Sequence, residues 1–195
     1  LPLWVRIVAA FLLIDVWMYA WHRLNHRVPF LWRLHRVHHS DAQMDVTTAS
    51  RFHTGEIVLS SILRIGVIAA LGVSAWELVL YETAMFAVVQ FHHSNLGVSP
   101  GLDRALRAVI ATPAMHKVHH SRWQPETDSN YGSLFSWWDR LFNSFRMRVD
   151  VSTIRLGLDG FDTPEHESLR GLVAMPAAPL DGLEDDARNR PPEGE

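Results

Sequence analysis

Histidine is the residue type whose spacing in this chain could do chemistry. Twelve of the 195 residues are histidines, and eleven of them lie between His22 and His120. Ten of these eleven form one HxxxH motif, two HxxHH motifs and one HH pair, and His53 stands alone. A neutral imidazole is a good ligand for iron, zinc, copper or nickel. The motifs therefore indicate a metal site, and they are His22-Arg-Leu-Asn-His26, His35-Arg-Val-His38-His39, Phe91-His92-His93-Ser94 and His116-Lys-Val-His119-His120.

The helical spacing within these motifs indicates how many metal ligands each motif can supply. Residues at i, i+3 and i+4 share one helix face, with Cβ atoms about 5–6 Å apart. An HxxxH motif thus presents two imidazoles to one point, and an HxxHH motif presents three, of which the adjacent pair can reach two neighbouring metals. His92 and His93 cannot point the same way on a helix, and we favour His93. The nine predicted ligands, enough for two metals, are His22, His26, His35, His38, His39, His93, His116, His119 and His120.

Two apolar stretches must position these histidines. Leu3–Trp21 is almost wholly apolar and long enough for a membrane-spanning helix. Ile57–Gln90 is also apolar but is interrupted at Gly72-Val-Ser74, which predicts helices over Glu56–Leu71 and Ala75–Phe91. These could be two full spans or a hairpin that enters the bilayer and returns. The pattern predicts an all-α integral membrane protein whose apolar hairpin forms a channel for substrate.

Charge and composition set the orientation and exclude several classes. The arginines that follow the first span predict a cytoplasmic helical cap that carries the metal site, by the positive-inside rule; they are Arg23, Arg27, Arg33 and Arg36. We expect a membrane domain over 1–150 and an acidic, largely disordered tail over 151–195. The net charge of −3 gives no support for nucleic-acid binding, and the absence of cysteine excludes thiolate metal sites.

Five further residues are candidates for supporting the ligands, because a metal-bound imidazole usually donates its second N–H to a partner. Asp15 lies deep in the first span, where it serves either a helix–helix hydrogen bond or the histidines two turns later. No catalytic residue is expected beyond the ligands. The chain contains neither an HExxH protease motif nor a GxSxG elbow. The candidate supporting residues are Asp15, His53, Asn95, Asp128 and Asn130.

The ordered motifs resemble those of the fatty acid hydroxylase/sterol desaturase superfamily, a family of integral membrane di-iron enzymes. The resemblance covers roughly Asp15 to Phe145 and is greatest to the branch that contains alkylglycerol monooxygenase and bacterial sterol-desaturase-like proteins. It rests on DVWMYAWHRLNH, LWRLHRVHHS, SRFHTGE, FHHSN, TPAMHKVHHSR and NYGSLFSWWDRLFNSF.

This resemblance implies two iron ions held by the nine histidines on the cytoplasmic side of the membrane, although a purified sample could carry zinc. It implies that O₂ is activated and that a lipid is hydroxylated or desaturated, the lipid being fatty acyl, sterol-like or an ether lipid. Electrons would come from a separate carrier such as cytochrome b5 or ferredoxin. Thr54 follows His53 where sterol-acting members have proline, so the role of His53 stays open.

Three other functions fit a cluster of histidines. A metal transporter would need ligands along the spans, whereas these histidines lie at one end of them. A non-catalytic metal-binding scaffold would tolerate closed coordination. A metal-dependent lipid hydrolase would use bound hydroxide and would need neither O₂ nor a reductant. Dependence on O₂ and a reductant therefore discriminates an oxygenase from a hydrolase.

Overall fold

The computed structural model describes residues 1–161 and 163–179, and its regular elements there are helices. The all-helical part of the predicted fold class is therefore confirmed. Three short 3-10 helices are η1 (Thr48–Ser50), η2 (Val151–Thr153) and η3 (Met175–Ala177). The α-helices are α1 (Leu3–Arg27), α2 (Pro29–His39), α3 (Thr54–Leu71), α4 (Ala75–His93), α5 (Pro100–Leu106), α6 (Pro113–His119), α7 (Gln124–Thr127), α8 (Trp137–Leu141), α9 (Pro164–Glu167) and α10 (Leu169–Ala174).

Helices α1 and α3 are long and apolar enough to cross a membrane. The 25 residues of α1 extend about 38 Å and the 18 residues of α3 about 27 Å, against a hydrocarbon core about 30 Å thick. In α3 only 6% of the apolar window is buried inside the protein. A helix that is apolar on nearly all sides and hardly covered by protein fits a lipid environment better than water.

Helices α3 and α4 form the hairpin that the sequence predicts, each within two residues of the expected bounds. Gly72 ends α3 with a φ of +65°, a left-handed conformation that glycine adopts without steric cost. Ser74 and Glu77 then form a capping box at the start of α4. Away from the turn, Arg64 of α3 and Glu82 of α4 form an ion pair across the hairpin, with Nη1 3.0 Å from Oε1.

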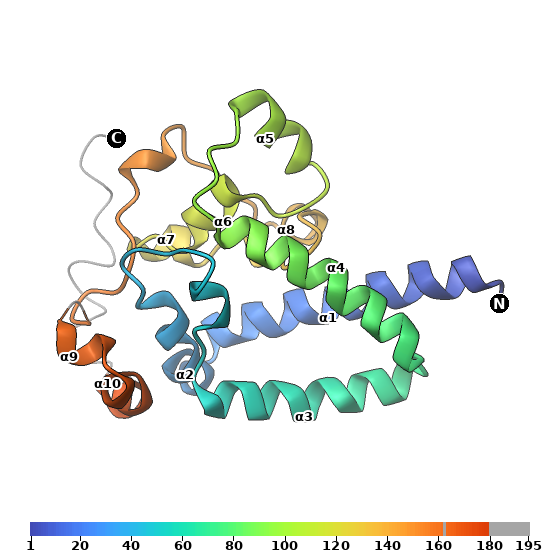
Figure 1. Cartoon of the computed structure of the whole chain (residues 1–195), viewed down its shortest axis with the longest axis horizontal. Helices are drawn as coiled ribbons and strands as arrows, with labels where there is room; N and C mark the ends of the chain where they lie inside the picture. Colours follow the sequence, from blue (N-terminus) through green and yellow to red (C-terminus); the bar gives the residue numbers. More distant parts are fainter. Residues whose placement is uncertain (162, 180–195) are drawn as a thin grey trace.

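The short helices gather around one end of the long ones (Figure 1). Figure 1 shows α2, α6 and α7 near the C-terminal half of α1, away from the N-terminus and from the α3–α4 turn. The first residues of α3 and the last residues of α4 lie in the same region. Every histidine motif is therefore on a helix end that reaches this part of the protein.

Asp15 ties α1 to the rest of the fold. Its side chain is fully buried and accepts three hydrogen bonds. Tyr81 Oη of α4 donates to Oδ1 at 2.8 Å, while the Phe135 backbone N–H and Trp138 Nε1 donate to Oδ2 at 3.0 and 2.8 Å. These hydrogen bonds connect α1 to α4 and to the segment at the start of α8, in line with the helix–helix role considered for Asp15. A supporting role toward the histidines stays a prediction.

The chain after residue 150 is more ordered than the sequence suggested. Helices α9, α10 and η3 lie within the stretch expected to be a largely disordered tail. Arg36 of α2 is buried and donates hydrogen bonds to the carbonyls of Met175 and Ala178. An apolar cluster joins the same regions, and it contains Trp32, Val37, Leu158, Phe161 and Met175. Residues 180–195, the rest of the expected tail, lie outside the described residues.

We predict that Asp15→Ala lowers stability substantially, because it leaves a tyrosine hydroxyl, an indole N–H and a backbone N–H without their acceptor. Each such loss costs about 1–3 kcal/mol. Tyr81→Phe, which removes only one donor, should cost about 1 kcal/mol. The measurement is the midpoint of thermal loss of helical circular dichroism in detergent micelles. Equal midpoints for the wild type and Asp15→Ala would contradict the role assigned to this carboxylate.

Candidate metal centre

The nine histidines predicted as ligands come together in two buried groups. Within each group the candidate ligand atoms lie within 4.8 Å of one another. The first group takes its members from α1, α2 and α6, and the second from α2, α4 and the end of α6. The first consists of His22, His26, His35, His39 and His119, and the second of His38, His93, His116 and His120.

Each HxxHH motif supplies histidines to both groups. Adjacent residues on a helix point about 100° apart, so His38 and His39 enter different groups, as do His119 and His120. The rings of His39 and His120, one from each group, stack with centroids 4.4 Å apart. The two groups are therefore direct neighbours.

The donor set fits metal ions. Several imidazole nitrogens are buried without a hydrogen-bond partner among the described residues, including both nitrogens of His26 and of His39. Other nitrogens face one another at short range. His93 Nε2 lies 3.3 Å from His38 Nε2 and 3.0 Å from His116 Nε2, and His116 Nε2 lies 3.2 Å from His120 Nε2. Single protons cannot satisfy all the nitrogens that face one another in such a group, whereas a metal cation at the centre of the group would.

Burial keeps these imidazoles in the form that binds metal. It lowers the pKa of His39, His116 and His120 well below the usual value, and neighbouring imidazoles lower the pKa further. The rings are therefore neutral at pH 7, with a lone pair available on each.

Backbone carbonyls fix which nitrogen carries the proton. His22 Nδ1 donates to the Tyr131 carbonyl at 2.9 Å, His38 Nδ1 to the Thr48 carbonyl at 3.0 Å, and His119 Nδ1 to the Ser129 carbonyl at 2.6 Å. A carbonyl only accepts, so the proton sits on Nδ1 and the Nε2 lone pair points into the group.

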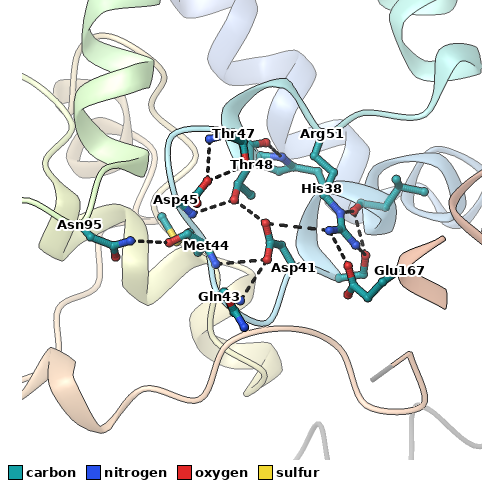
Figure 2. Close-up of polar contacts among 12 residues, drawn as sticks. His38, Asp41, Gln43, Met44, Asp45, Thr47, Thr48, Arg51, Asn95 and Glu167 are labelled. Carbon is teal, nitrogen blue, oxygen red and sulfur yellow. Dashed lines mark hydrogen bonds and ion pairs between the residues drawn. The ribbon is translucent and has the colours of Figure 1, made fainter. Parts of the chain in front are cut away.

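Figure 2 shows how the loop after α2 holds one of these carbonyls. Thr48 is fully buried, and its hydroxyl donates to Asp41 Oδ2 at 2.5 Å while accepting from the Asp45 backbone N–H at 2.9 Å. Arg51 lies beside Asp41 at 4.0 Å and pairs with Glu167 at 2.8 Å. The Thr48 carbonyl is thereby held against His38 by contacts on both sides of the loop.

Glu56 is a site residue that the sequence reasoning missed. It is 5% exposed, and its Oε1 accepts from His35 Nδ1 at 2.8 Å and from Asn25 Nδ2 at 3.1 Å. An acidic residue in the first turn of an otherwise apolar helix, three positions after His53, was the available signal. The carboxylate orients His35 as the carbonyls orient the other rings.

The other predicted supporting residues lie at varied distances from the groups. Asp128 Oδ1 is 3.5 Å from His26 Nδ1. Asn130 donates to the Met115 and Arg146 carbonyls, and Asn95 donates to the Met44 carbonyl (Figure 2). His53 caps α3 by accepting from the Gly55 N–H at 3.0 Å. The three bind backbone, so a role toward the metal site stays a prediction for them.

His92, the neighbour that we did not favour, is also close to the second group. It is buried, and its ring centroid is 3.9 Å from that of His116. It lies outside the set of four whose ligand atoms converge.

A cavity of about 330 Å³ lies beside both histidine groups, between α1, α3 and α4. At one end it is lined by His22, His35 and His93 together with Asn25 and Glu56. Away from the histidines the lining is mostly apolar, and it includes Trp17, Met18, Ile57, Met85, Phe86 and Val89. The arrangement can hold a hydrocarbon chain against the two candidate metal sites.

Comparisons with known proteins agree with this geometry. The family described as fatty acid hydroxylase matches residues 7–144. The chain is 28% identical over 183 residues to the ornithine lipid hydroxylase OlsE of Rhizobium tropici, covering 92% of this chain and 51% of that protein. It is 32% identical over 149 residues to the alkylglycerol monooxygenase of Danio rerio, covering 72% of this chain and 30% of that protein.

A more distant similarity, 22% over 143 residues, is to the cholesterol 25-hydroxylase of Rattus norvegicus, covering 72% of this chain and 47% of that protein. The chain thus spans between about a third and about half of the length of these relatives. No solved structure matches the chain significantly.

We predict that each histidine group holds one metal ion. Replacing a histidine of one group, as in His39→Ala or His120→Ala, should lower the bound metal from about two ions per chain to about one, because a buried site loses a ligand. The measurement is metal content by mass spectrometry after purification. His166→Ala, outside both groups, is the control. Two ions in all three variants would rule out this ligand assignment.

We also predict that the metal-free chain loses stability as the pH falls below about 6.5. The histidine pKa is depressed in the folded state, so the unfolded chain binds more protons below that value, and the stabilisation present above it is lost. Asp139 opposes this trend, since burial raises its pKa to about 6, but it is one group against several.

Thermal midpoints of the chelator-treated chain between pH 8 and pH 5 test this expectation. The metal-loaded chain should keep its midpoint to a lower pH, because the metal competes with protons for the same nitrogens. A midpoint of the metal-free chain that stays level from pH 8 to pH 5 would show that the histidines are not buried as neutral groups.

Proposed function

The chain belongs to the fatty acid hydroxylase family, and we propose that it hydroxylates a C–H bond of a membrane lipid at a dinuclear iron centre, using O₂ and external electrons. The observation that carries the proposal is the convergence of nine imidazoles, seven of them on buried residues, into two adjacent groups beside a largely apolar cavity. The names of the relatives, a lipid hydroxylase and a monooxygenase, support hydroxylation over desaturation, which uses the same type of centre.

Each part of the site has a task in this reaction. Two iron ions held by the nine histidines would supply the O₂-activating redox chemistry that amino-acid side chains lack. The carbonyls of Tyr131, Thr48 and Ser129 hold the ligand rings in one tautomer, so that the lone pairs point inward before any metal arrives. Glu56 does the same for His35.

The cavity binds and positions the substrate. Ile57, Met85 and Phe86 offer an apolar wall to a hydrocarbon chain and exclude water from the histidine end. The wall comes mainly from the α3–α4 hairpin, the segment expected from its apolarity to form a substrate channel. A lipid could thus enter from the bilayer without passing through water.

A membrane location with the metal centre on the cytoplasmic face belongs to the same proposal. The two candidate spans support it, as do Arg23 and Arg27 at the end of α1 that carries the histidines. Because the centre needs electrons, we also propose a separate donor protein such as cytochrome b5 or ferredoxin.

Iron loading and O₂ consumption test the proposal. The full chain, purified in detergent from iron-supplemented cells, should contain about two irons that are magnetically coupled in Mössbauer spectra. Addition of a reductant and a lipid extract should then cause O₂ uptake, and His39→Ala should abolish it. Two bound zinc ions that resist replacement by iron, or lipid cleavage without O₂ and reductant, would instead support a scaffold or a hydrolase.

A further inference from the structure

The histidine end of the cavity contains two buried oxygen atoms that have no hydrogen-bond donor. Asn25 is 2% exposed and Glu56 is 5% exposed, and both line the cavity. Asn25 Nδ2 and His35 Nδ1 both donate to Glu56 Oε1. Glu56 Oε2 and Asn25 Oδ1 are left without a partner among the described residues.

The hydrogen bonds that Asn25 and Glu56 make also fix the orientation of their two unpaired oxygens, Asn25 Oδ1 and Glu56 Oε2. If the Asn25 amide were turned over, its oxygen would face the Glu56 carboxylate, which would replace a hydrogen bond by repulsion. Asn25 therefore keeps its nitrogen on Glu56, and its Oδ1 is an acceptor. A buried acceptor without a donor costs free energy, and an unpaired carboxylate oxygen costs more than a neutral one. A ligand that donates hydrogen bonds at this point would remove that cost.

Two other polar side chains of the cavity are already occupied. The Ser60 hydroxyl donates to the Ile57 carbonyl at 3.1 Å, and Arg64 pairs with Glu82 at 3.0 Å, more than two helical turns beyond Glu56. Asn25 and Glu56 thus mark the end beside His35 as a place for donors. An anionic headgroup placed there would gain no donor from either residue.

We propose that the lipid bound in this cavity carries a hydrogen-bond-donating, non-anionic polar group, a hydroxyl or an amine, that binds to Glu56 Oε2 and Asn25 Oδ1, with its hydrocarbon chain along Met85, Phe86 and Val89. This inference rests on the proposed function for identifying the cavity as the substrate site. The polar group then lies beside His35, so the oxidised carbon is near the polar end of the lipid and not at the far end of its chain.

Three probes with the same brominated eleven-carbon chain test the inference: 11-bromoundecanol, its methyl ether and 11-bromoundecanoate. Bromine quenches tryptophan fluorescence on contact, and Trp17 and Trp21 line the cavity. The protein is the full chain, loaded with zinc so that no turnover occurs, in lipid nanodiscs at pH 8. The alcohol should bind at least about tenfold more tightly than the ether, which has no donor, and than the carboxylate, which has no donor and is anionic.

Glu56→Gln sharpens the test. The glutamine Oε1 can still accept from His35 and Asn25, while its amide N–H₂ replaces the unpaired Oε2 and turns an acceptor into a donor. The preference for the alcohol over the carboxylate should therefore disappear or reverse. Ser60→Ala is the matched control, because it lines the same cavity but its hydroxyl is already bonded; it should leave the ranking unchanged.

Equal affinities for the three probes, tightest binding of the carboxylate, or an unchanged ranking in Glu56→Gln with full zinc content would overturn the inference. If that variant fails to fold or to hold zinc, the ranking in the wild type decides alone. These measurements need neither O₂ nor iron. The expected ranking without O₂ uptake by the iron-loaded chain would count against the proposed oxygenase only, and O₂ uptake without the ranking would count against this inference only.

Discussion

The fold depends on the burial of many imidazole lone pairs around two nearby points. Taking a polar group out of water costs free energy unless it is paired, and here nitrogens such as His93 Nε2 and His116 Nε2 face each other at 3.0 Å. Charging the rings would not help, because burial and the neighbouring rings both disfavour the protonated form. A metal cation would resolve this conflict, since it would convert mutually opposed lone pairs into ligands. The fold can be understood as the set of contacts that keeps the rings in place for it.

The segments between helices contribute as much to that geometry as the helices do. A helix uses most of its carbonyls in its own hydrogen bonds, whereas loop carbonyls are available. Thr48, Ser129 and Tyr131 each present a backbone carbonyl to a histidine. Asp139 holds the last of these loops by accepting from the Tyr131 and Gly132 N–H groups at 2.7 and 2.9 Å. Irregular backbone near the histidines is therefore specified by buried polar contacts.

A feature could be predicted from the sequence when the residues that determine it lie close together in the chain. The histidine groups and the α3–α4 hairpin could be predicted, because helical periodicity and the break at Gly72 act within a few residues. Glu56 could not, since its role depends on Asn25 and His35, which reach it through tertiary packing. The order after residue 150 was missed for the same reason: composition describes the segment alone, while its helices are held by Arg36 of α2.

The fold must join the long apolar helices to the polar histidine site. A hydrocarbon chain leaves one apolar environment readily only for another, and α3 and α4 line a largely apolar cavity that reaches the histidines. The same helices must end where the chemistry begins, so α4 finishes at His93 and α3 starts two residues before Glu56. At this junction the cavity wall changes from hydrocarbon to imidazole, amide and carboxylate within about one helical turn. A molecule with an apolar chain and a polar end would match that boundary, and the position of the boundary would set which of its carbons faces the histidine groups.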